Sequence, residues 1–400
     1  MSLPRVLYVG NFPPHPGGSG VIANYLMTGL HEAGYPLSVV TASSPEMADR
    51  HDLVQRDYPG IDLVEVPAPQ ALIQPWGWRL DHPDRLAHVN GVLAGCTTLA
   101  KRARHDVVLL GAEFFLDCML PWAAAHGLPL VSRATAIAML LAGVYGPAMR
   151  RHVFRLMPMA SRIVTPAHHL TTTLTQHGLS NVVTIPNPVD ATLFRPAATD
   201  EELAVRLRLG PDHVVVAHAS NFKPVKRVGD ILAAADLAVT RDPRLIFLVM
   251  GDGEDRASLE VAVRERGLSD HFRITGWVGR DAIAAHLRLA HMALMPSTTE
   301  GLSSAYLEAM ATALPLLASD VAAAREVIDD GKNGFLFPVG DTTAIADLIV
   351  GLAADNELRH RVGRNARAYV ERNHRVDVAI DLLRKILADV VRYGGITAAP

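Results

Sequence analysis

The sequence predicts an α/β protein made of two doubly wound domains, each with a parallel sheet covered by helices. Short apolar runs alternate with helical patterns along the chain, and a Pro-rich polar stretch at 187–203 separates two such series. The 400 residues also exceed what one ordinary hydrophobic core accommodates. Both observations favour two domains that face a central cleft, because ligands of such sheets bind beyond the carboxyl ends of the strands.

The first series opens with the apolar run 6–9, which predicts a buried strand. The loop NFPPHPGGSG follows, then a helical pattern that stops at Gly34, and then the strand LSVVTAS, which together form a βαβ unit. Further strands are expected in DLVEVP, HDVVLLGA, LPLVSRA and SRIVTPA. Residues 67–90 are rich in Pro, Trp and His, and we interpret them as a long functional loop or an insertion.

The second series begins near Asp212. Its expected strands lie in HVVVAHAS, LIFLVMGDG, HFRITGW, MALMPS, LPLLAS and GFLFPV. We therefore expect an N-terminal domain over residues 1–188 and a C-terminal domain over 189–375. A final helix is expected within 376–400, and the sequence leaves open whether it crosses back to the N-terminal domain.

Composition excludes several classes of function. Hydrophobic residues make up 49% of the chain, charged residues 20%, and the net charge is -3, without the basic runs of a nucleic-acid surface. Two cysteines, Cys96 and Cys118, argue against a disulfide framework and for a cytoplasmic location. No apolar stretch is long enough to insert into a membrane. The 18 histidines follow no metal-ligand spacing, so no metal or other cofactor is expected.

Two loops at predicted strand ends favour phosphate or sugar binding. Gly18, Ser19 and Gly20 let a ligand approach the backbone, although a plain strand-to-helix turn explains them too. The second loop is SNFKPVKR, residues Ser220 to Arg227. The compact ammonium charge of Lys226 and the two parallel N–H donors of the Arg227 guanidinium suit a diphosphate. A solvated run of charges at the start of a helix is the alternative. Asn221 belongs to the same loop.

Two glycine-containing strand ends have both a structural and a functional interpretation. The stretch MGDGE contains Gly253 and is interpreted first as a structural turn. Trp277 and Val278 follow another predicted strand and could flank a nucleobase, but a partly buried tryptophan is an equal alternative. Neither stretch identifies a ligand without the neighbouring loops.

The stretch STTEGLSSAYLEAM holds two glutamates, Glu300 and Glu308, around the expected start of a helix at Ser303 or Ser304. Free N–H groups of the first helical turn attract an anion, whereas carboxylates accept hydrogen bonds from hydroxyls. Glu308 therefore suits ribose hydroxyls and Glu300 suits a sugar beyond a diphosphate. The pattern predicts a site for a nucleotide sugar, with a capping acid and a surface acid as the alternative.

Over nearly its whole length the chain resembles the family 4 retaining glycosyltransferases, which have the GT-B fold of two Rossmann-like domains. The resemblance rests on GGSG, SNFKPVKR, MGDGE, EGLSSAYLEAMATALPLLASD and REVIDDGKNGFLFPVGD, and it is closest to the small-acceptor branch of bacillithiol- and mycothiol-type enzymes. It implies that Lys226 and Arg227 bind the donor diphosphate. It further implies that Glu308 binds the ribose, that Glu300 binds the donor sugar, and that no metal is needed.

Two departures from the family pattern concern the donor loop and the acceptor. Leu302 and Ser303 replace an aromatic–glycine pair, and a serine N–H still suits a phosphate. The family's His-Gly motif is replaced by Ser132–Ala136, so the acceptor or the donor sugar is expected to be unusual. The acceptor candidates are Glu113, Arg133 and a loop with Trp76 and Trp78.

We therefore expect a retaining transferase for a small polar acceptor in antibiotic or thiol-conjugate metabolism, with S-glycosylation as one option. Glu300, Lys226 and Arg227 are the expected catalytic residues, in a front-face transfer helped by the leaving diphosphate. The donor carries UDP or GDP. The alternatives are another enzyme on this fold, a non-catalytic nucleotide-sugar-binding relative, and a lipid or polysaccharide glycosyltransferase. The sequence leaves open whether the protein forms a homodimer.

Overall fold

The computed structural model describes residues 3–12, 18–43, 60–68 and 78–394. The chain divides into two compact units. Unit 1 comprises Met1–Asn187 together with Val376–Pro400, and unit 2 comprises Pro188–Arg375. The chain therefore passes between the units twice, first within the Pro-rich stretch and again before its last helix.

Unit 1 contains a parallel sheet in which the described strands follow the order β3-β2-β1-β4-β5-β6-β7. The order reverses between β1 and β4, which places a topological switch point there. The strands are β1 Val6–Val9, β2 Leu37–Ser43, β3 Asp62–Pro67, β4 Val107–Leu110, β5 Leu130–Arg133, β6 Arg162–Thr165 and β7 Val182–Thr184.

Unit 2 contains a second parallel sheet, with the order β10-β9-β8-β11-β12-β13 among its described strands. Here the switch point lies between β8 and β11. The strands are β8 Val214–Ser220, β9 Leu245–Gly251, β10 Phe272–Gly276, β11 Met292–Met295, β12 Leu316–Ser319 and β13 Phe335–Phe337.

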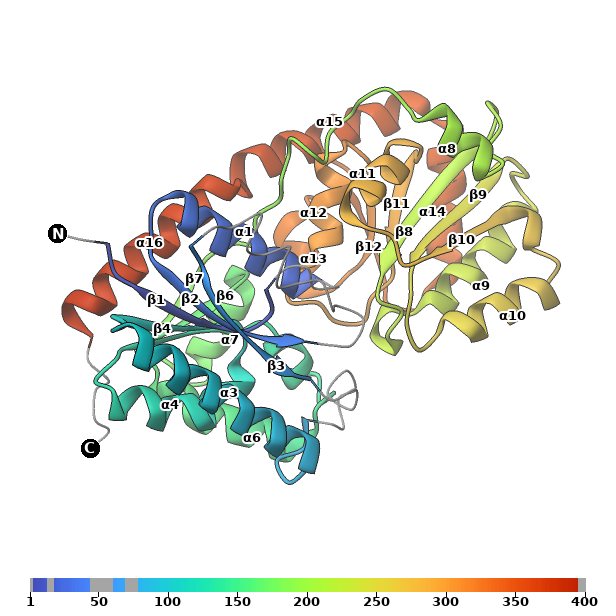
Figure 1. Cartoon of the computed structure of the whole chain (residues 1–400). Helices are drawn as coiled ribbons and strands as arrows, with labels where there is room; N and C mark the ends of the chain where they lie inside the picture. Colours follow the sequence, from blue (N-terminus) through green and yellow to red (C-terminus); the bar gives the residue numbers. More distant parts are fainter. Residues whose placement is uncertain (1–2, 13–17, 44–59, 69–77, 395–400) are drawn as a thin grey trace. The chain divides into compact units, whose positions relative to one another are not determined.

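Helices follow most of the strands in both units (Figure 1). Those of unit 1 are α1 Gly18–Glu32, α3 Pro83–Arg102, α4 Leu116–Ala125, α5 Ile137–Leu141, α6 Gly146–Leu156, α7 His168–Gln176 and α16 Val376–Tyr393. Those of unit 2 are α8 Glu201–Arg206, α9 Val228–Val239, α10 Arg256–Glu265, α11 Arg280–Arg288, α12 Ser304–Ala311, α13 Ala322–Val327, α14 Thr342–Ala354 and α15 Asn356–Asn373. Short 3-10 turns are η4 Glu113–Phe115, η5 Met157–Met159, η6 Pro224–Lys226 and η7 Ser269–His271.

The predicted strands are confirmed in both units, since each expected apolar run contains an observed strand. The predicted end of the first helix at Gly34 is also confirmed by its φ of 83°, a left-handed conformation that glycine adopts without strain. The short strand β7 was not predicted. Its residues are only half-buried, so the apolar signal of a central strand is absent there.

Two expected loops turn out to be partly helical. Gly18, Ser19 and Gly20 form the first turn of α1 rather than a loop before it. Within the expected loop 67–90, residues from Pro83 onward belong to α3, while 69–77 lie outside the described residues. Proline is favoured in the first helical turn because its missing N–H has no helical partner there, so a residue that indicated a loop in fact begins a helix.

The last helix, α16, belongs to unit 1 and lies beside α1 (Figure 1). It buries Leu383 and Leu387 completely in the apolar cluster that also contains β1 and α1 residues. Gly29 of α1 permits this contact, because a side chain there would come within 2.0 Å of Ile380. The core of unit 1 therefore depends on residues from both ends of the chain.

We expect Leu383→Ala to destabilise unit 1 by about 2–5 kcal/mol, since the fully buried side chain leaves a cavity between α16 and the sheet. Urea unfolding of the full chain, followed by tryptophan fluorescence, measures this. Val391→Ala, on the exposed side of the same helix, serves as the matched control and should change stability by less than about 0.5 kcal/mol. Equal midpoints for the two variants would contradict the packing role of α16.

Candidate functional site

The sequence-predicted donor residues of unit 2 gather on two loops that leave neighbouring strands at the switch point. The loop after β8 carries Ser220 to Arg227, and the loop after β11 carries Ser297 to Glu300. The backbone N–H of Thr298 donates to the carbonyl oxygen of Val225 over 2.9 Å, which ties the two loops together. Their position at the carboxyl ends of adjacent strands is the usual ligand position in such a sheet.

An ion pair joins the same loops through side chains. Lys226 Nζ donates to Glu300 Oε1 over 2.5 Å, and Ser297 Oγ donates to the same oxygen over 2.8 Å. The Lys226 and Glu300 side chains are only 13% and 8% exposed. Two such buried charges stabilise each other, whereas either one alone would be costly. The structure thus brings together two of the three predicted catalytic residues.

The third predicted catalytic residue, Arg227, faces a different partner. Its Nε and Nη2 donate to the two carboxylate oxygens of Asp230 over 2.5 and 2.8 Å, one turn along α9. Its backbone is left-handed, with φ 50° and ψ 46°, which turns the chain from η6 into the helix. The guanidinium of Arg227 is therefore already paired with a carboxylate from the adjoining helix.

Ser220 is held at the end of β8 by a buried histidine that the sequence analysis did not select. His218 Nε2 lies 2.8 Å from Ser220 Oγ, and His218 Nδ1 lies 2.8 Å from the Leu294 carbonyl oxygen. Because a carbonyl oxygen only accepts, Nδ1 carries the proton and the serine hydroxyl donates to Nε2. Burial, helped by the nearby Lys226 charge, lowers the His218 pKa to about 4, so the ring stays neutral at neutral pH.

Gly251 and Gly253 have a packing role beside this loop. A side chain on Gly251 would come within 1.8 Å of the Ser220 carbonyl oxygen, and one on Gly253 within 2.1 Å of the Asn221 carbonyl oxygen. Their φ values are 133° and 154°. These glycines let the end of β9 lie directly against the loop after β8, which supports the structural interpretation of the MGDGE turn.

Glu308 lies inside α12 in an unusual state for a carboxylate. It is 6% exposed, and within the described part of the chain its carboxylate makes no hydrogen bond. Burial raises its pKa to about 7, and the Arg280 charge counteracts this only partly. A buried carboxylate without donors is costly, so this side chain is set to accept hydrogen bonds from hydroxyls.

The predicted start of the helix between the two glutamates is confirmed. Ser303 is the N-cap of α12 with an extended backbone, and Ser304 is its first residue. The Ser303 side chain makes no capping hydrogen bond, which leaves that role to a ligand or water. Leu302 is buried beneath the turn, while both serines are half-buried.

Tyr306 adds a polar group that sequence reasoning missed. It is fully buried, and its hydroxyl finds no hydrogen-bond partner among the described residues. Burial and the neighbouring Glu300 charge raise its pKa well above the usual value, so it remains a neutral donor. Its apolar ring gave no signal in the sequence, because tyrosines in helices mostly belong to the core.

Trp277 and Val278 follow β10, which is an edge strand of the unit 2 sheet, whereas α12 follows β11 near the switch point. The Trp277 side chain is 64% exposed, and Val278 is half-buried. The expectation of a partly buried tryptophan is therefore wrong, because the strand ends one residue earlier at Gly276 and the chain turns outward with φ 74°. An exposed indole remains free to lie against a flat ligand.

In unit 1, the predicted glycine turn and the acceptor candidates lie at the carboxyl ends of β1, β4 and β5. Gly18 and Ser19 are exposed at the start of α1, Gly20 is buried, and Ser19 Oγ accepts from Asn11 Nδ2 over 3.2 Å. Glu113 and Arg133 are both buried. Trp76 lies outside the described residues.

Glu113 closes the turn that follows β5. Its carboxylate accepts the N–H groups of Thr135 and Ala136 over 2.9 and 3.0 Å. Burial raises its pKa to about 7 despite these donors and the Arg133 charge. Trp78 stacks on the adjacent Phe114 at a centroid distance of 4.7 Å, so the described part of the tryptophan loop forms an aromatic wall beside Glu113.

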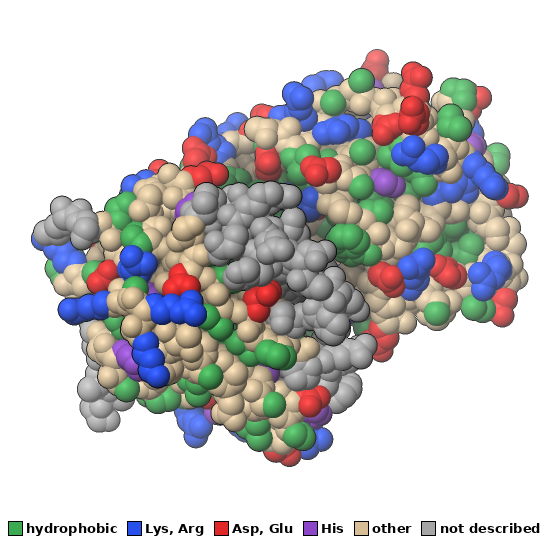
Figure 2. Space-filling view, viewed as in Figure 1, with side chains coloured by type: hydrophobic (Ala, Val, Ile, Leu, Met, Phe, Trp, Pro, Cys, Tyr) green, Lys and Arg blue, Asp and Glu red, His purple; other side chains and the backbone are tan. Residues whose placement is uncertain are grey.

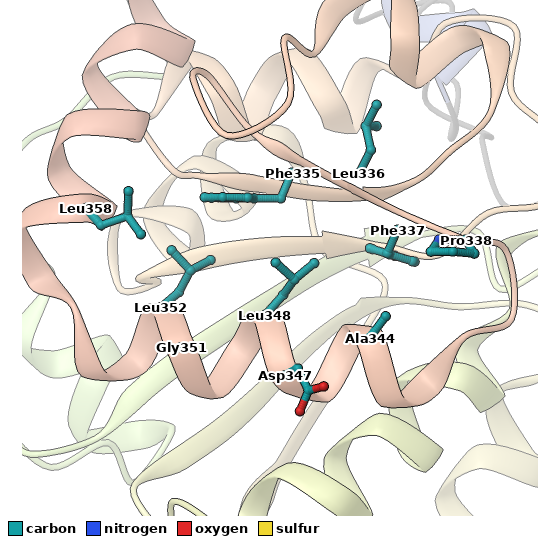
Figure 3. Close-up of a pocket in the computed structure, with 10 residues that line it drawn as sticks. All are labelled: Phe335, Leu336, Phe337, Pro338, Ala344, Asp347, Leu348, Gly351, Leu352 and Leu358. Atoms are coloured by element: carbon teal, nitrogen blue, oxygen red, sulfur yellow. The ribbon is translucent and has the colours of Figure 1, made fainter.

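A surface pocket of about 450 Å³ lies elsewhere in unit 2, between the edge strand β13 and the helices α14 and α15 (Figure 3). Leucine and phenylalanine side chains dominate its lining, and it shares no residue with the loops after β8 and β11. It offers neither charges for a diphosphate nor a pair of hydroxyl acceptors. The chemistry of the unit therefore lies at the strand ends and not in this pocket.

The face drawn in Figure 2 and the described side chains show neither a single-sign charged surface nor a metal centre. Acidic and basic side chains are intermixed over the face drawn in Figure 2, as the balanced composition predicts. In the described part of the chain, no three His, Cys, Asp or Glu side chains are grouped to hold a metal ion. No helix among the described residues is long and apolar enough to span a bilayer.

Comparison with known proteins gives two family matches that together span most of the chain. The model described as Glycosyltransferase Family 4 matches residues 16–193, and the model described as Glycosyl transferases group 1 matches residues 200–369. The second match contains Lys226, Glu300 and Glu308. The first contains Glu113 and Arg133.

Similar proteins include N-acetyl-alpha-D-glucosaminyl L-malate synthase of Bacillus anthracis, 27% identical over 95% of this chain and 96% of that protein. The 2-deoxystreptamine N-acetyl-D-glucosaminyltransferase of Streptomyces fradiae is 29% identical over 69% of each chain. The crystal structure of Anabaena HepE in complex with UDP-glucose superimposes with a TM-score of 0.80 at 19% identity, over 96% of this chain and 100% of that one. The last likeness confirms the predicted GT-B fold, and the family matches show that the chain belongs to the family 4 glycosyltransferases, enzymes that use nucleotide sugars.

Proposed function

We propose that this glycosyltransferase moves a sugar from a UDP-sugar to a small polar acceptor, with retention at the sugar carbon. The observation that carries the proposal is the buried Lys226–Glu300 pair that joins the two loops at the switch point of unit 2. The HepE protein of Anabaena, which shares the fold, has been crystallised in complex with UDP and with UDP-glucose. The relatives include an L-malate and a 2-deoxystreptamine glycosyltransferase, and these small acceptors support specialised metabolism as the setting.

The ion pair suggests how the donor would be bound. An arriving diphosphate competes for the Lys226 ammonium, and Glu300 then becomes available to accept hydrogen bonds from sugar hydroxyls. Glu308, buried and without a hydrogen-bond donor in the described structure, would accept the ribose hydroxyls. The uncapped N-terminus of α12 lies between the two glutamates in sequence and offers N–H groups to phosphate oxygens.

The same groups support a transfer step in which the leaving group is stabilised. As the bond between the sugar carbon and the diphosphate oxygen breaks, negative charge grows on that oxygen, and Lys226 with the α12 N–H groups stabilises it. The acceptor's nucleophile then attacks from the face that the diphosphate leaves, and the diphosphate oxygen takes its proton. Arg227 would contribute after exchanging its present partner, Asp230, for phosphate.

UDP should raise the melting temperature of the wild-type chain, because a ligand that binds only the folded state stabilises it. Glu308→Gln keeps the shape of the side chain but removes its charge, and we expect it to weaken UDP binding about 10- to 100-fold. Glu265→Gln on the exposed side of α10 is the control and should bind like wild type. A panel with GDP identifies the base, and a wild-type chain that responds to neither nucleotide would overturn the proposal.

Lys226→Met should lower turnover of the sugar nucleotide about 100- to 1,000-fold while the protein remains folded. The measurement is release of nucleoside diphosphate from the donor that stabilises the protein best. Lys332→Met removes an exposed lysine that pairs with Asp329 and should leave turnover unchanged. Turnover near the wild-type level in Lys226→Met would sink the proposed role of the ammonium.

The Glu308 pKa also predicts the pH dependence of stability in the free protein. The folded pKa of about 7 exceeds the reference value of 4.5, so between these pH values the folded state keeps a proton that the unfolded state loses. Stability therefore falls as the pH rises through this range. We expect Glu308→Gln to be more stable than wild type by up to about 3 kcal/mol at pH 8 and by less than about 1 kcal/mol at pH 5.

Urea unfolding of both proteins at pH 5 and pH 8, without nucleotide, measures this difference. Glu265→Gln again serves as the control, since an exposed glutamate should give no pH-dependent change. A wild-type protein and a Glu308→Gln variant with parallel pH profiles would show that Glu308 is not held in its neutral form.

A further inference from the structure

Unit 1 contains a buried cation that makes no hydrogen bond or ion pair among the described residues. Arg133, the last residue of β5, is 5% exposed, and its Nη1 is fully buried without a hydrogen-bond partner. Across the described residues, its guanidinium makes no ion pair and no side-chain hydrogen bond. Arginine is almost never fully buried unless it is paired, because an isolated charge loses its hydration. The side chain therefore indicates a missing anion.

Glu113 is near enough to influence Arg133 electrostatically but does not satisfy it. Both carboxylate oxygens of Glu113 already accept backbone N–H groups, those of Thr135 and Ala136. Burial raises the pKa of Glu113 to about 7, and the Arg133 charge acts in the opposite direction. Arg133 and Glu113 thus attract each other electrostatically, but no ion pair or hydrogen bond joins them among the described residues.

Tyr8 is the other group whose charge state is linked to Arg133, and it is committed elsewhere. Its hydroxyl donates to the Asn11 carbonyl oxygen over 2.9 Å. Burial raises its pKa to about 12, so it is neutral. A side chain on Gly10 or Gly111 would come within 2.8 or 2.5 Å of this hydroxyl oxygen, so the backbone closes around it. Among the described residues, neither Glu113 nor Tyr8 accepts a hydrogen bond from Arg133.

The position of Arg133 favours a ligand as the source of the anion. It ends β5, next to β4 at the switch point of the sheet, and the carboxyl ends of such strands are where ligands bind. Beside Glu113, Phe114 stacks on Trp78 and meets Tyr145 edge-on at 4.8 Å, which provides an aromatic wall. A charged fork next to such a wall suits a small organic anion.

We propose that Arg133 binds an anionic group of the acceptor, a carboxylate or a phosphate monoester. This inference rests on the proposed function, because it specifies the acceptor class of the same enzyme. A guanidinium presents two parallel N–H donors that match either anion. The same positive charge repels a protonated aminocyclitol, so Arg133 would separate anionic from cationic acceptors.

The test compares melting temperatures of full-length wild type, Arg133→Met and Arg133→Lys, in low-salt buffer with saturating UDP to occupy the donor site. Inorganic phosphate, malonate and 2-deoxystreptamine are the probes. At roughly ten times its dissociation constant, a binding anion should raise the wild-type melting temperature by about 2–4 °C. Arg133→Met should show no such rise.

A second readout distinguishes a binding residue from a structural one. Without added anion, Arg133→Met should melt at or above the wild-type temperature, because it removes an unpaired buried charge. A shift with phosphate alone identifies a phosphorylated acceptor, and one with malonate alone a carboxylate. Equal shifts in wild type and Arg133→Met, or a shift only with 2-deoxystreptamine, would overturn the inference.

If Arg133→Met does not fold, Arg133→Lys decides the question. Its single ammonium lacks the fork and should bind the same anion about tenfold more weakly, so an unchanged response counts against the proposal. The UDP shift, measured first on each protein, keeps the two proposals separate. Its absence in wild type would remove the donor proposal, whereas a normal UDP shift without any effect of anions would remove only the acceptor inference.

Discussion

The ion pair between Lys226 and Glu300 is the contact on which the donor loops depend. At a switch point, the segments after β8 and β11 leave the sheet toward opposite faces, so they need a direct contact to stay together. The buried pair and the Thr298–Val225 backbone hydrogen bond supply it. A lone buried charge is costly. In the ligand-free protein, Lys226 and Glu300 can both stay charged and buried because each stabilises the other.

Both units place a cation at the carboxyl ends of their strands near the switch point, but in different states. In unit 2 the lysine at the switch point has a carboxylate partner, and the diphosphate of a donor would replace it. In unit 1 Arg133 has no such internal partner among the described residues. Burial raises the pKa of both Glu308 and Glu113 to about 7, but Glu113 accepts two backbone N–H groups while the Glu308 carboxylate accepts none among the described residues. These four side chains are all largely buried, and they differ in the hydrogen bonds and ion pairs that they make.

Much of the fold follows from local sequence patterns. Continuous apolar runs identify buried parallel strands, and the serines before LEAM place the start of α12 correctly. The sequence could not reveal contacts between distant residues. Lys226 and Glu300 are 74 positions apart. Arg227 and Asp230 are only three positions apart, but the sequence does not show whether the guanidinium pairs with Asp230 or with a ligand. The half-buried β7 and the proline that begins α3 were missed because their local signals favour other structures.

The return of α16 to unit 1 determines when that unit can be completed during synthesis. Its first 187 residues leave the ribosome with the surface for Leu383 and Leu387 still exposed to water. All of unit 2 must be translated before the missing helix emerges, which at typical translation rates takes about 10–40 s. During that time unit 2 can fold, whereas unit 1 presents an apolar groove that chaperones recognise. The unit synthesised first is therefore the last to be finished.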